Sequence, residues 1–327
     1  MSSERPLPSM FREVIPHEFG SGGHTRKVNA MGWNKDGRFA SAANEVKLWD
    51  VDAHGNARWS STLENTSHST QDLAWDPTSS HTLALCSQDK ELHVYDVRGN
   101  KPVQEYVSDG ENINVAWSPN GQYIAMGTMR SSPQGTPIDV MGIYDVRHAK
   151  KRLKTVRFFY AINDFIWSPN GEVLITGTGD GHIELIRVSG FKNGAGTKMT
   201  RFKRIAAHTV ACFSVAMAPR ESRYMAVGSA DALVSLWDVD NLVCVRTLPR
   251  LETSVRSVSF SHNDHYLASG SEDHVIDIAE VETGECAHQI NVGNRSTSAL
   301  AWHPKELLLA SASGKDLALW RFKEHAV

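Results

Sequence analysis

Serine, histidine and aspartate side chains occur together at several places in this chain, in combinations that could support nucleophilic catalysis. The most complete set is His208, Ser229 and Asp231, which are the three residue types of a hydrolase triad. The same types return at regular intervals along the chain, however, whereas a catalytic triad occurs once. No Gly-x-Ser-x-Gly motif, which exposes a nucleophilic serine on a sharp turn, is present. The sequence therefore predicts no catalytic residues and a structural role for these three.

Two glycine-rich segments imitate phosphate-binding loops, and one histidine pair imitates a metal site. Residues 177–181 lie between two strand-like runs rather than before a helix, so no helix N-terminus is available to an anion. Residues 194–198 lack the Gly-Lys-Ser/Thr order of a P-loop and are interpreted as a flexible loop. His262 and His265 lie at the position where other segments carry a Ser-Pro-Asn-Gly turn. We therefore interpret them as residues of a solvated turn rather than as metal ligands. We predict no cofactor-binding and no metal-binding residues.

The overall composition is that of an ordinary globular protein. The 327 residues are 41% hydrophobic and 22% charged, and the net charge of −3 predicts no global attraction to nucleic acid or anionic membranes. No apolar run is long enough for a membrane span, and the N-terminus lacks the apolar core of a signal peptide. The four cysteines form no Cys-x-x-Cys pair, which argues against a zinc site and favours a reducing, intracellular compartment.

The elements that must position these side chains form an internal repeat. An apolar or aromatic anchor precedes a polar turn in seven segments, at intervals of 42 to 50 residues. The anchors are Trp33, Trp75, Trp117, Trp167, Met217, Phe260 and Trp302. A second series closes each unit, as at Trp49-Asp50 and Trp237-Asp238. This period, with about four short strands in each unit, predicts an all-β, seven-bladed β-propeller.

The two ends of the chain predict how the ring closes. The seventh unit stops soon after its third strand, and residues 11–18 precede the first unit without a place in the repeat. We expect this N-terminal strand to complete the last blade and so to protect a sheet edge. The predicted boundaries are a flexible segment at 1–10 and a single propeller domain at 11–327. Extra residues at 129–138 and 189–198 are expected to form loops on opposite faces, with proline and glycine excluding regular structure from the first.

The repeat resembles that of WD-repeat (WD40) propellers. Gly23-His24 precedes Trp49-Asp50 in the first unit, as in the Gly-His to Trp-Asp frame of that family. The resemblance implies that the fifth unit builds a buried chain of hydrogen bonds from four side chains, namely His208, Ser229, Asp231 and Trp237. In such a chain the indole donates to the hydroxyl, the hydroxyl to the imidazole, and the imidazole to the carboxylate. The fourth unit ends in Ile-Arg and the sixth in Ala-Glu, so these blades are predicted to rely on packing alone.

Units five and six resemble one branch of this family more closely. Residues 228–240 and 271–284, with the unusual Ile-Asp-Ile-Ala-Glu ending, are similar to the WD-repeat subunit of the THO complex. Residues 110–119 and 301–305 also match. The resemblance implies a nuclear, non-catalytic scaffold that contacts the large helical subunits of a THO/TREX assembly in transcription-coupled mRNA processing and export. It implies neither a membrane nor a small-molecule substrate.

A second hypothesis comes from two tetrapeptides, Tyr95-Asp-Val-Arg98 and Tyr144-Asp-Val-Arg147. Consecutive endings of this kind resemble the motif by which WD-repeat substrate receptors bind the adaptor of cullin-4 ubiquitin ligases. The alternative interpretation is structural, with each aspartate capping a strand end and each arginine exposed in a loop. The sequence leaves both interpretations open.

Charge is strongly segregated around the predicted ring. Residues 146–163 and 185–220 contain no acidic residue, whereas no Lys or Arg occurs between Arg256 and Arg295. The predicted basic patch lies on blades three and four, with Arg98 and Lys101 beside it, and its other members are Arg147, Lys150, Lys151, Arg152, Lys154, Arg157, Lys198 and Lys203. We hypothesise that this patch binds RNA phosphates or an acidic segment of a partner subunit. The alternative is a solvated face, because no aromatic residues are clearly interleaved for base stacking.

Overall fold

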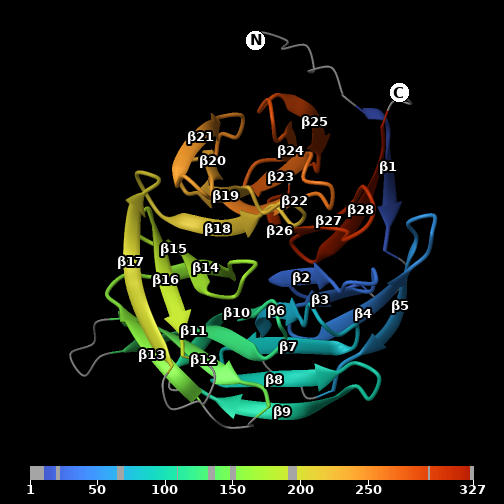
Figure 1. Cartoon of the computed structure of the whole chain (residues 1–327). Helices are drawn as coiled ribbons and strands as arrows, with labels where there is room; N and C mark the ends of the chain where they lie inside the picture. Colours follow the sequence, from blue (N-terminus) through green and yellow to red (C-terminus); the bar gives the residue numbers. More distant parts are fainter. Residues whose placement is uncertain are drawn as a thin grey trace.

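The computed structural model describes residues 11–19, 23–64, 70–108, 110–131, 137–147, 152–190, 197–293 and 295–324. Within these ranges the chain forms seven four-stranded antiparallel sheets, which are arranged in a ring as the blades of a β-propeller (Figure 1). This architecture confirms the fold class predicted from the repeat.

In the first six blades the strands follow chain order from the inside of the ring to the outside. Blade one consists of β2 (Ala30–Trp33), β3 (Phe39–Ala42), β4 (Val46–Val51) and β5 (Ala57–Thr62). Blade two consists of β6 (Thr70–Trp75), β7 (Thr82–Ser87), β8 (Glu91–Asp96) and β9 (Lys101–Val107). Blade three consists of β10 (Glu111–Trp117), β11 (Tyr123–Ser131), β12 (Pro137–Asp145) and β13 (Arg152–Phe158). Blade four consists of β14 (Ile162–Trp167), β15 (Val173–Thr178), β16 (His182–Ser189) and β17 (Lys198–Ala206). Blade five consists of β18 (Cys212–Met217), β19 (Tyr224–Ser229), β20 (Val234–Asp238) and β21 (Val243–Leu248). Blade six consists of β22 (Val255–Phe260), β23 (Tyr266–Ser271), β24 (Val275–Glu280) and β25 (Cys286–Asn291).

Blade seven is built from both ends of the chain. Its strands β26 (Thr297–Trp302), β27 (Leu308–Ser313) and β28 (Asp316–Glu324) are completed by β1 (Phe11–Glu18), which pairs with β28 along the outer edge (Figure 1). Phe11 is buried, and its ring centroid lies 4.7 Å from those of Phe322 and of Tyr266 in blade six. The predicted closure by an N-terminal strand is therefore confirmed. Residues 1–10 lie outside the described residues, and their flexibility stays a prediction.

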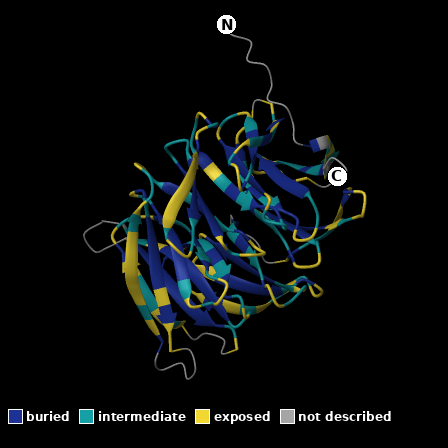
Figure 2. Ribbon diagram, turned by 45° about the horizontal axis from the view of Figure 1, so that its top comes forward, coloured by how far each residue is buried: buried dark blue, intermediate teal, exposed yellow. Residues whose placement is uncertain are grey.

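Burial depends on how far a strand lies from the outside of the ring. All residues of β19 and β23 are buried, because each second strand has neighbouring blades on both of its faces. The outer strand β21 is exposed along almost its whole length, and Figure 2 shows exposed residues concentrated on outer strands and loops. The hydrophobic core is consequently a series of layers between blades, such as the layer that joins Leu236 of blade five to Leu267 of blade six.

The tryptophan anchors of the first four units form hydrogen bonds between blades. Each lies at the end of an innermost strand and donates its Nε1–H to a backbone carbonyl of the preceding blade. The pairs are Trp33 with Ala301 at 2.9 Å, Trp75 with Gly32 at 3.1 Å, Trp117 with Ala74 at 3.0 Å and Trp167 with Ala116 at 3.2 Å. Met217 and Phe260 have no such donor, and the buried Nε1 of Trp302 has no partner within the described ranges. The indole bonds therefore secure four of the seven blade interfaces.

A second set of polar contacts crosses every interface near the central channel. The carboxylate of Asp72 accepts the backbone N–H of Val115 at 2.9 Å, and that of Asp164 accepts the N–H of Val215 at 2.8 Å. Burial raises the pKa of Asp72 to about 7 and that of Asp164 to about 6. The other five interfaces are bridged by Asn29, Asn114, Ser214, Ser257 and Ser298. These side chains fix the rotation of each blade relative to the next.

The two predicted long loops have different outcomes. Both ends of the first predicted loop, 129–138, are part of β-strands. Antiparallel pairing of β11 with β12 continues from Met129 opposite Asp139 to Ser131 opposite Pro137. The prediction of an irregular segment over 129–138 is therefore wrong at both ends, while 132–136 lie outside the described residues. The second loop lies between β16 and β17, the third and fourth strands of blade four, as predicted. Within the described ranges, no helix has the length and apolar character needed to cross a membrane.

Candidate interaction surfaces

The buried chain of hydrogen bonds in blade five runs through Ser235 rather than through Ser229. The Nε1–H of Trp237 donates to Ser235 Oγ at 2.7 Å, and Nε2 of His208 lies 2.8 Å from the same oxygen. The other ring nitrogen of His208 lies 3.0 Å from a carboxylate oxygen of Asp231. The structure thus brings His208, Asp231 and Trp237 together, and the prediction of Ser229 as the connecting hydroxyl is wrong.

Strand register explains this exchange of serines. In blade one the hydroxyl comes from the second strand, where Ser41 lies 2.9 Å from the Trp49 indole nitrogen and 2.7 Å from His24 Nε2. The corresponding residue of blade five is Val227, and its cross-strand partner Ser235 on the third strand provides the hydroxyl. Ser229 instead donates to the backbone carbonyl of Ala211 at 2.9 Å, and it shapes the turn that follows β19.

Blades four and six do not rely on packing alone, contrary to the prediction. At the position of Ser235 they carry the buried carboxylates Glu184 and Asp277, which are 2% and 1% exposed. Glu184 accepts a bond from Arg201 Nε at 2.9 Å and lies 3.4 Å from Arg204 Nε. Asp277 binds Arg250 through two nitrogens at 2.8 and 2.9 Å. These ion pairs, in which the carboxylate is buried and the arginine reaches toward solvent, hold the third strand of each blade against neighbouring segments of the chain.

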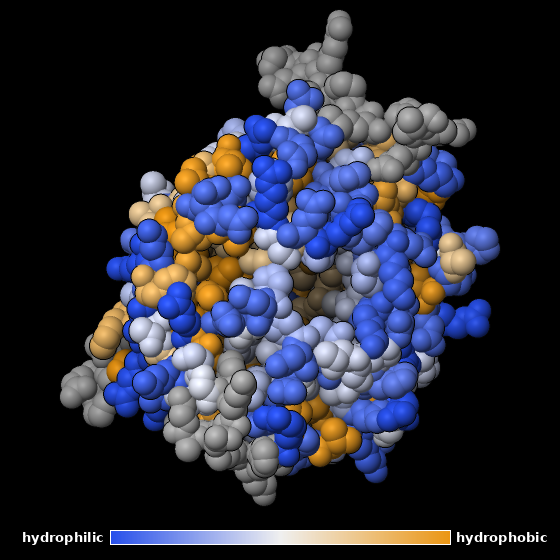
Figure 3. Space-filling view, in the orientation of Figure 1, coloured by the Kyte–Doolittle hydropathy of each residue, from blue (hydrophilic) through white to orange (hydrophobic). Residues whose placement is uncertain are grey.

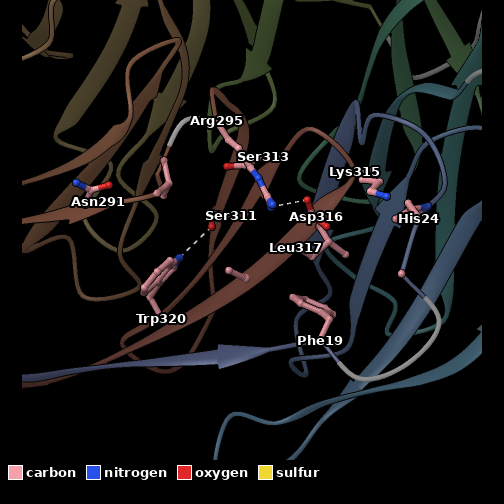
Figure 4. A pocket seen from close by; sticks show the side chains of 13 residues that line it. Phe19, His24, Asn291, Arg295, Ser311, Ser313, Lys315, Asp316, Leu317 and Trp320 are labelled. Atoms are coloured by element: carbon pink, nitrogen blue, oxygen red, sulfur yellow. Dashed lines mark hydrogen bonds and ion pairs between the residues drawn. The ribbon is translucent and has the colours of Figure 1, made fainter.

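Blade seven retains only part of the hydrogen-bonded chain, and a pocket occupies the remaining space. Trp320 Nε1 donates to Ser311 Oγ at 2.9 Å, and this hydroxyl has no further partner within the described ranges. A pocket of about 650 Å³ opens beside these two side chains (Figure 4). An ion pair between Arg295 and Asp316 lines the pocket, so both charge signs are present. Lys315 also lines the pocket, so the described lining carries two cationic side chains and one carboxylate.

Two arginines of the predicted basic patch are engaged in local ion pairs. Arg98 Nε lies 2.9 and 3.2 Å from the two carboxylate oxygens of Asp96, and these bonds lower the pKa of Asp96 to about 2. Arg147 binds Asp145 in the same way, with its Nη2 at 2.9 Å from the carboxylate. Each aspartate also accepts the backbone N–H of its arginine at 3.0 Å. Both Tyr-Asp-Val-Arg segments are thus self-contained turns whose arginines remain 67% and 50% exposed.

A second group of predicted cations is exposed without such pairing. Lys154 and Arg157 lie on β13, Lys198 and Lys203 lie on β17, and no ion pair joins any of the four to another described residue. The two outer strands contact each other across the boundary of blades three and four, where Arg201 donates to the backbone carbonyl of Arg157 (Figure 1). We call the surface formed by Lys154, Arg157, Lys198, Lys203 and Phe202 the basic rim.

The remaining members of the predicted patch are one residue on β13, one on blade two and two outside the described residues. Arg152 is exposed at the start of β13. Lys101 Nζ lies 3.7 Å from a carboxylate oxygen of Glu64, so it is partly neutralised. Lys150 and Lys151 lie outside the described residues.

Sequence reasoning missed an aromatic residue within the basic rim. The Phe202 side chain is 44% exposed, and the guanidinium of Arg187 lies 4.8 Å from its ring centroid. Arg187 also lines a groove of about 750 Å³ between the two Ser-Pro-Asn-Gly turns, at Pro119 and Pro169. The sequence signal was the alternation of one aromatic with basic residues in Arg201-Phe-Lys-Arg204. An exposed ring and several cations therefore share one surface.

The motifs that imitate ligand sites occupy turns. Residues 179–181 connect β15 to β16, and Gly181 has a φ of 84°, which a glycine adopts without strain. His262 and His265 flank a turn in which Asn263 accepts the backbone N–H of His265 at 3.2 Å. Throughout the described ranges no three His, Cys, Asp or Glu side chains are grouped closely enough to hold a metal ion.

Three family models match parts of the chain. The model for the WD domain, G-beta repeat, matches residues 199–238, and the model for the anaphase-promoting complex subunit 4 WD40 domain matches residues 235–305. The model for eukaryotic translation initiation factor eIF2A matches residues 27–192, which span blades one to three and three strands of blade four. Two of the three models are described as WD domains, and the segments that they match lie in blades four to seven.

Two of the relatives match about nine tenths of this chain. THO complex subunit 3 of Arabidopsis thaliana is 36% identical over 295 residues, which cover 89% of this chain and 87% of the relative. The chain belongs to the family of THO complex subunit 3. WD repeat-containing protein AAC3 of Dictyostelium discoideum is 28% identical over 93% of this chain and 66% of its own length. DDB1- and CUL4-associated factor 13 of Xenopus laevis is 22% identical over 62% of this chain and 42% of its own length. The protein is accordingly a WD-repeat scaffold of the THO subunit 3 type.

Proposed function

We propose that this protein is a non-catalytic subunit of a nuclear THO/TREX-type assembly that couples transcription to mRNA processing and export. The observation that carries this proposal is the similarity to THO complex subunit 3 over 89% of the chain. A propeller offers two faces and a rim of outer strands, so function resides in surfaces rather than in one cleft. We expect the large helical subunits of the assembly to bind these surfaces.

Depletion of the protein in its own cells tests the role in export. The proposal predicts that polyadenylated RNA accumulates in the nucleus, as measured by hybridisation with an oligo(dT) probe in fixed cells. Re-expression of the wild-type chain restores the cytoplasmic signal. An unchanged distribution of polyadenylated RNA in depleted cells contradicts the proposed role.

We further propose that the basic rim binds single-stranded RNA. Four exposed cations without ion pairs supply phosphate contacts, and Phe202 supplies a ring on which a base can stack. An exposed aromatic ring among cations favours a nucleic acid over a purely acidic peptide, because stacking adds roughly 1–3 kcal/mol for each base. Phe202 thus adds a stacking surface to the cations of the predicted RNA-binding patch.

A matched pair of charge reversals tests this contact. Lys198→Glu with Lys203→Glu changes the net charge by the same amount as Arg26→Glu with Lys27→Glu, and the control pair is exposed and distant in the chain from the basic rim. We expect the rim variant to weaken binding of a fluorescent oligo(U) and to lower the slope of log K against log salt by roughly 1.4. The control variant keeps the wild-type slope. Equal RNA binding by both variants, or binding of an acidic peptide alone, contradicts the proposal.

A further inference from the structure

A second hollow lies on the face of the propeller opposite the groove at Pro119 and Pro169. It has a volume of about 590 Å³. Its walls come from the start of β10, the facing ends of β11 and β12, and the connection from β13 to β14. The turn at 118–121 joins the other ends of β10 and β11, which places the two hollows on opposite faces. We call this hollow the acceptor pocket and define it by Glu111, Asn112, Met129, Asp139 and Phe159.

The floor of the acceptor pocket presents hydrogen-bond acceptors that the protein does not use fully. Asn112 is 1% exposed, and its amide donates to the backbone carbonyl of Glu91 at 2.8 Å. Its Oδ1 is buried and has no partner within the described ranges. A buried acceptor left without a donor costs about 1–3 kcal/mol. Asn112 is therefore held in place at the floor of the pocket with one buried acceptor, Oδ1, left unsatisfied.

A carboxylate lies in the same pocket and gives it a negative charge. Asp139 is 4% exposed, and its Oδ2 accepts the backbone N–H of Ile162 at 2.7 Å. Burial raises the pKa of this carboxyl, and no ion pair joins Asp139 to a Lys or Arg among the described residues. Glu111 adds a second carboxylate at the exposed margin, and the described residues that line the pocket include no Lys or Arg. The combination of carboxylates and a free amide oxygen selects a cationic donor.

Apolar side chains flank these acceptors and remain in contact with solvent. The Phe159 side chain is 86% exposed, and Met129 is 44% exposed. Full burial of one such side chain contributes about 1.5–3 kcal/mol, and that free energy is unused in the isolated chain. Figure 3 shows that hydrophilic residues cover much of the surface it displays, with hydrophobic residues gathered mainly to one side of the central hollow. An aromatic ring exposed beside a carboxylate is a suitable support for a cation and its alkyl stem.

We propose that the acceptor pocket binds an arginine side chain of a protein partner. The guanidinium carries five N–H donors in a planar fork, so it can bind the Asp139 carboxylate through two N–H groups, and a small shift of the pocket floor brings the buried Asn112 oxygen within reach of a third. Its methylene stem packs against Phe159 and Met129. The two carboxylates repel phosphates, which excludes RNA from this pocket. This proposal does not depend on the proposed function. The acceptor pocket is separate from the basic rim, and an arginine of any protein partner can occupy it.

A short peptide tests the proposal directly on the full chain. The probe is acetyl-Gly-Ser-Arg-Ser-Gly-amide at millimolar concentration, and the readout is the methyl NMR signal of Met129. We expect a saturable shift of this signal, with no shift from the citrulline peptide, which has the same shape without the charge. Asp139→Asn, which retains an acceptor for Ile162, and Phe159→Ala, which removes an exposed ring, should each weaken binding at least about tenfold.

A matched control separates the pocket from general apolar attraction. Phe202→Ala removes an exposed phenylalanine on β17 and should leave the affinity for the arginine peptide unchanged. Equal binding of the arginine and citrulline peptides overturns the proposal. So does wild-type affinity in both pocket variants, or a Met129 shift produced by oligo(U) and not by the arginine peptide.

Discussion

Replacement of Ser235 by alanine should destabilise blade five severely, because the Ser235 hydroxyl is the hydrogen-bond partner of two buried groups, the Trp237 indole and the His208 imidazole. Ser235 is 2% exposed, and its Oγ lies 2.7 Å from the Trp237 indole nitrogen and 2.8 Å from His208 Nε2. Alanine leaves the indole N–H and the imidazole nitrogen without partners in an interior that water does not reach. Each such group costs about 1–3 kcal/mol, so we expect Ser235→Ala to lower the free energy of unfolding by about 2–6 kcal/mol.

Ser229→Ala is the matched control, since it removes the same atom from the same hairpin. Ser229 donates to the carbonyl of Ala211 at 2.9 Å, and that carbonyl also accepts the backbone N–H of Ala230 at 2.9 Å. The acceptor therefore stays satisfied after the substitution, and the expected loss is about 1 kcal/mol. Equilibrium urea unfolding of the two variants and the wild type, followed by tryptophan fluorescence, measures the difference. A loss in Ser229→Ala equal to or larger than that in Ser235→Ala would refute the assigned hydrogen-bond path.

Two further predictions concern ring closure and pH. Removal of residues 1–20 deletes β1, exposes the edge of β28 and loses the burial of Phe11, so the melting temperature should fall clearly. Removal of residues 1–10 alone should leave the melting temperature unchanged. Equal melting temperatures of the two truncated chains contradict closure of the ring by β1. Because burial raises the pKa of Asp72 to about 7, its contribution to stability is present below about pH 4 and is lost as the pH rises through 7. Asp72→Asn should therefore gain stability relative to the wild type as the pH rises from about 4 to about 7, measured by thermal unfolding, and identical pH profiles would show that the carboxyl does not titrate in this range.

The ring and its closure could be predicted because they depend on spacing. Seven anchors at regular intervals specify seven sheets, and an unassigned strand at one end fits an unfinished sheet at the other. The connecting hydroxyl could not be predicted in the same way. Ser229 and Ser235 lie on the two strands of one hairpin, and only the register of Val227 opposite Ser235 decides which serine meets the indole.

The ion pairs were hidden for a related reason. The prediction for blades four and six used only the endings Ile186-Arg187 and Ala279-Glu280. The buried acids Glu184 and Asp277 lie two residues before these endings. A single acid within an otherwise apolar strand, as in Ile-Glu-Leu-Ile, is the signal that could have revealed them. The basic patch was likewise only partly predictable, because a tally of charges does not show that Arg98 and Arg147 fold back onto their own aspartates.

The central claim is that this chain is a scaffold of a THO-type assembly, and affinity purification from nuclei tests it most directly. The tagged wild-type chain and an Arg98→Ala, Arg147→Ala variant are purified in parallel, and the recovered proteins are quantified by mass spectrometry. Our account predicts that the large helical THO subunits are recovered in near-equal amounts with both chains, because Arg98 and Arg147 form local turns. Absence of these subunits, with recovery of the cullin-4 adaptor on the wild-type chain and its loss from the variant, would contradict the account and support the ligase receptor instead.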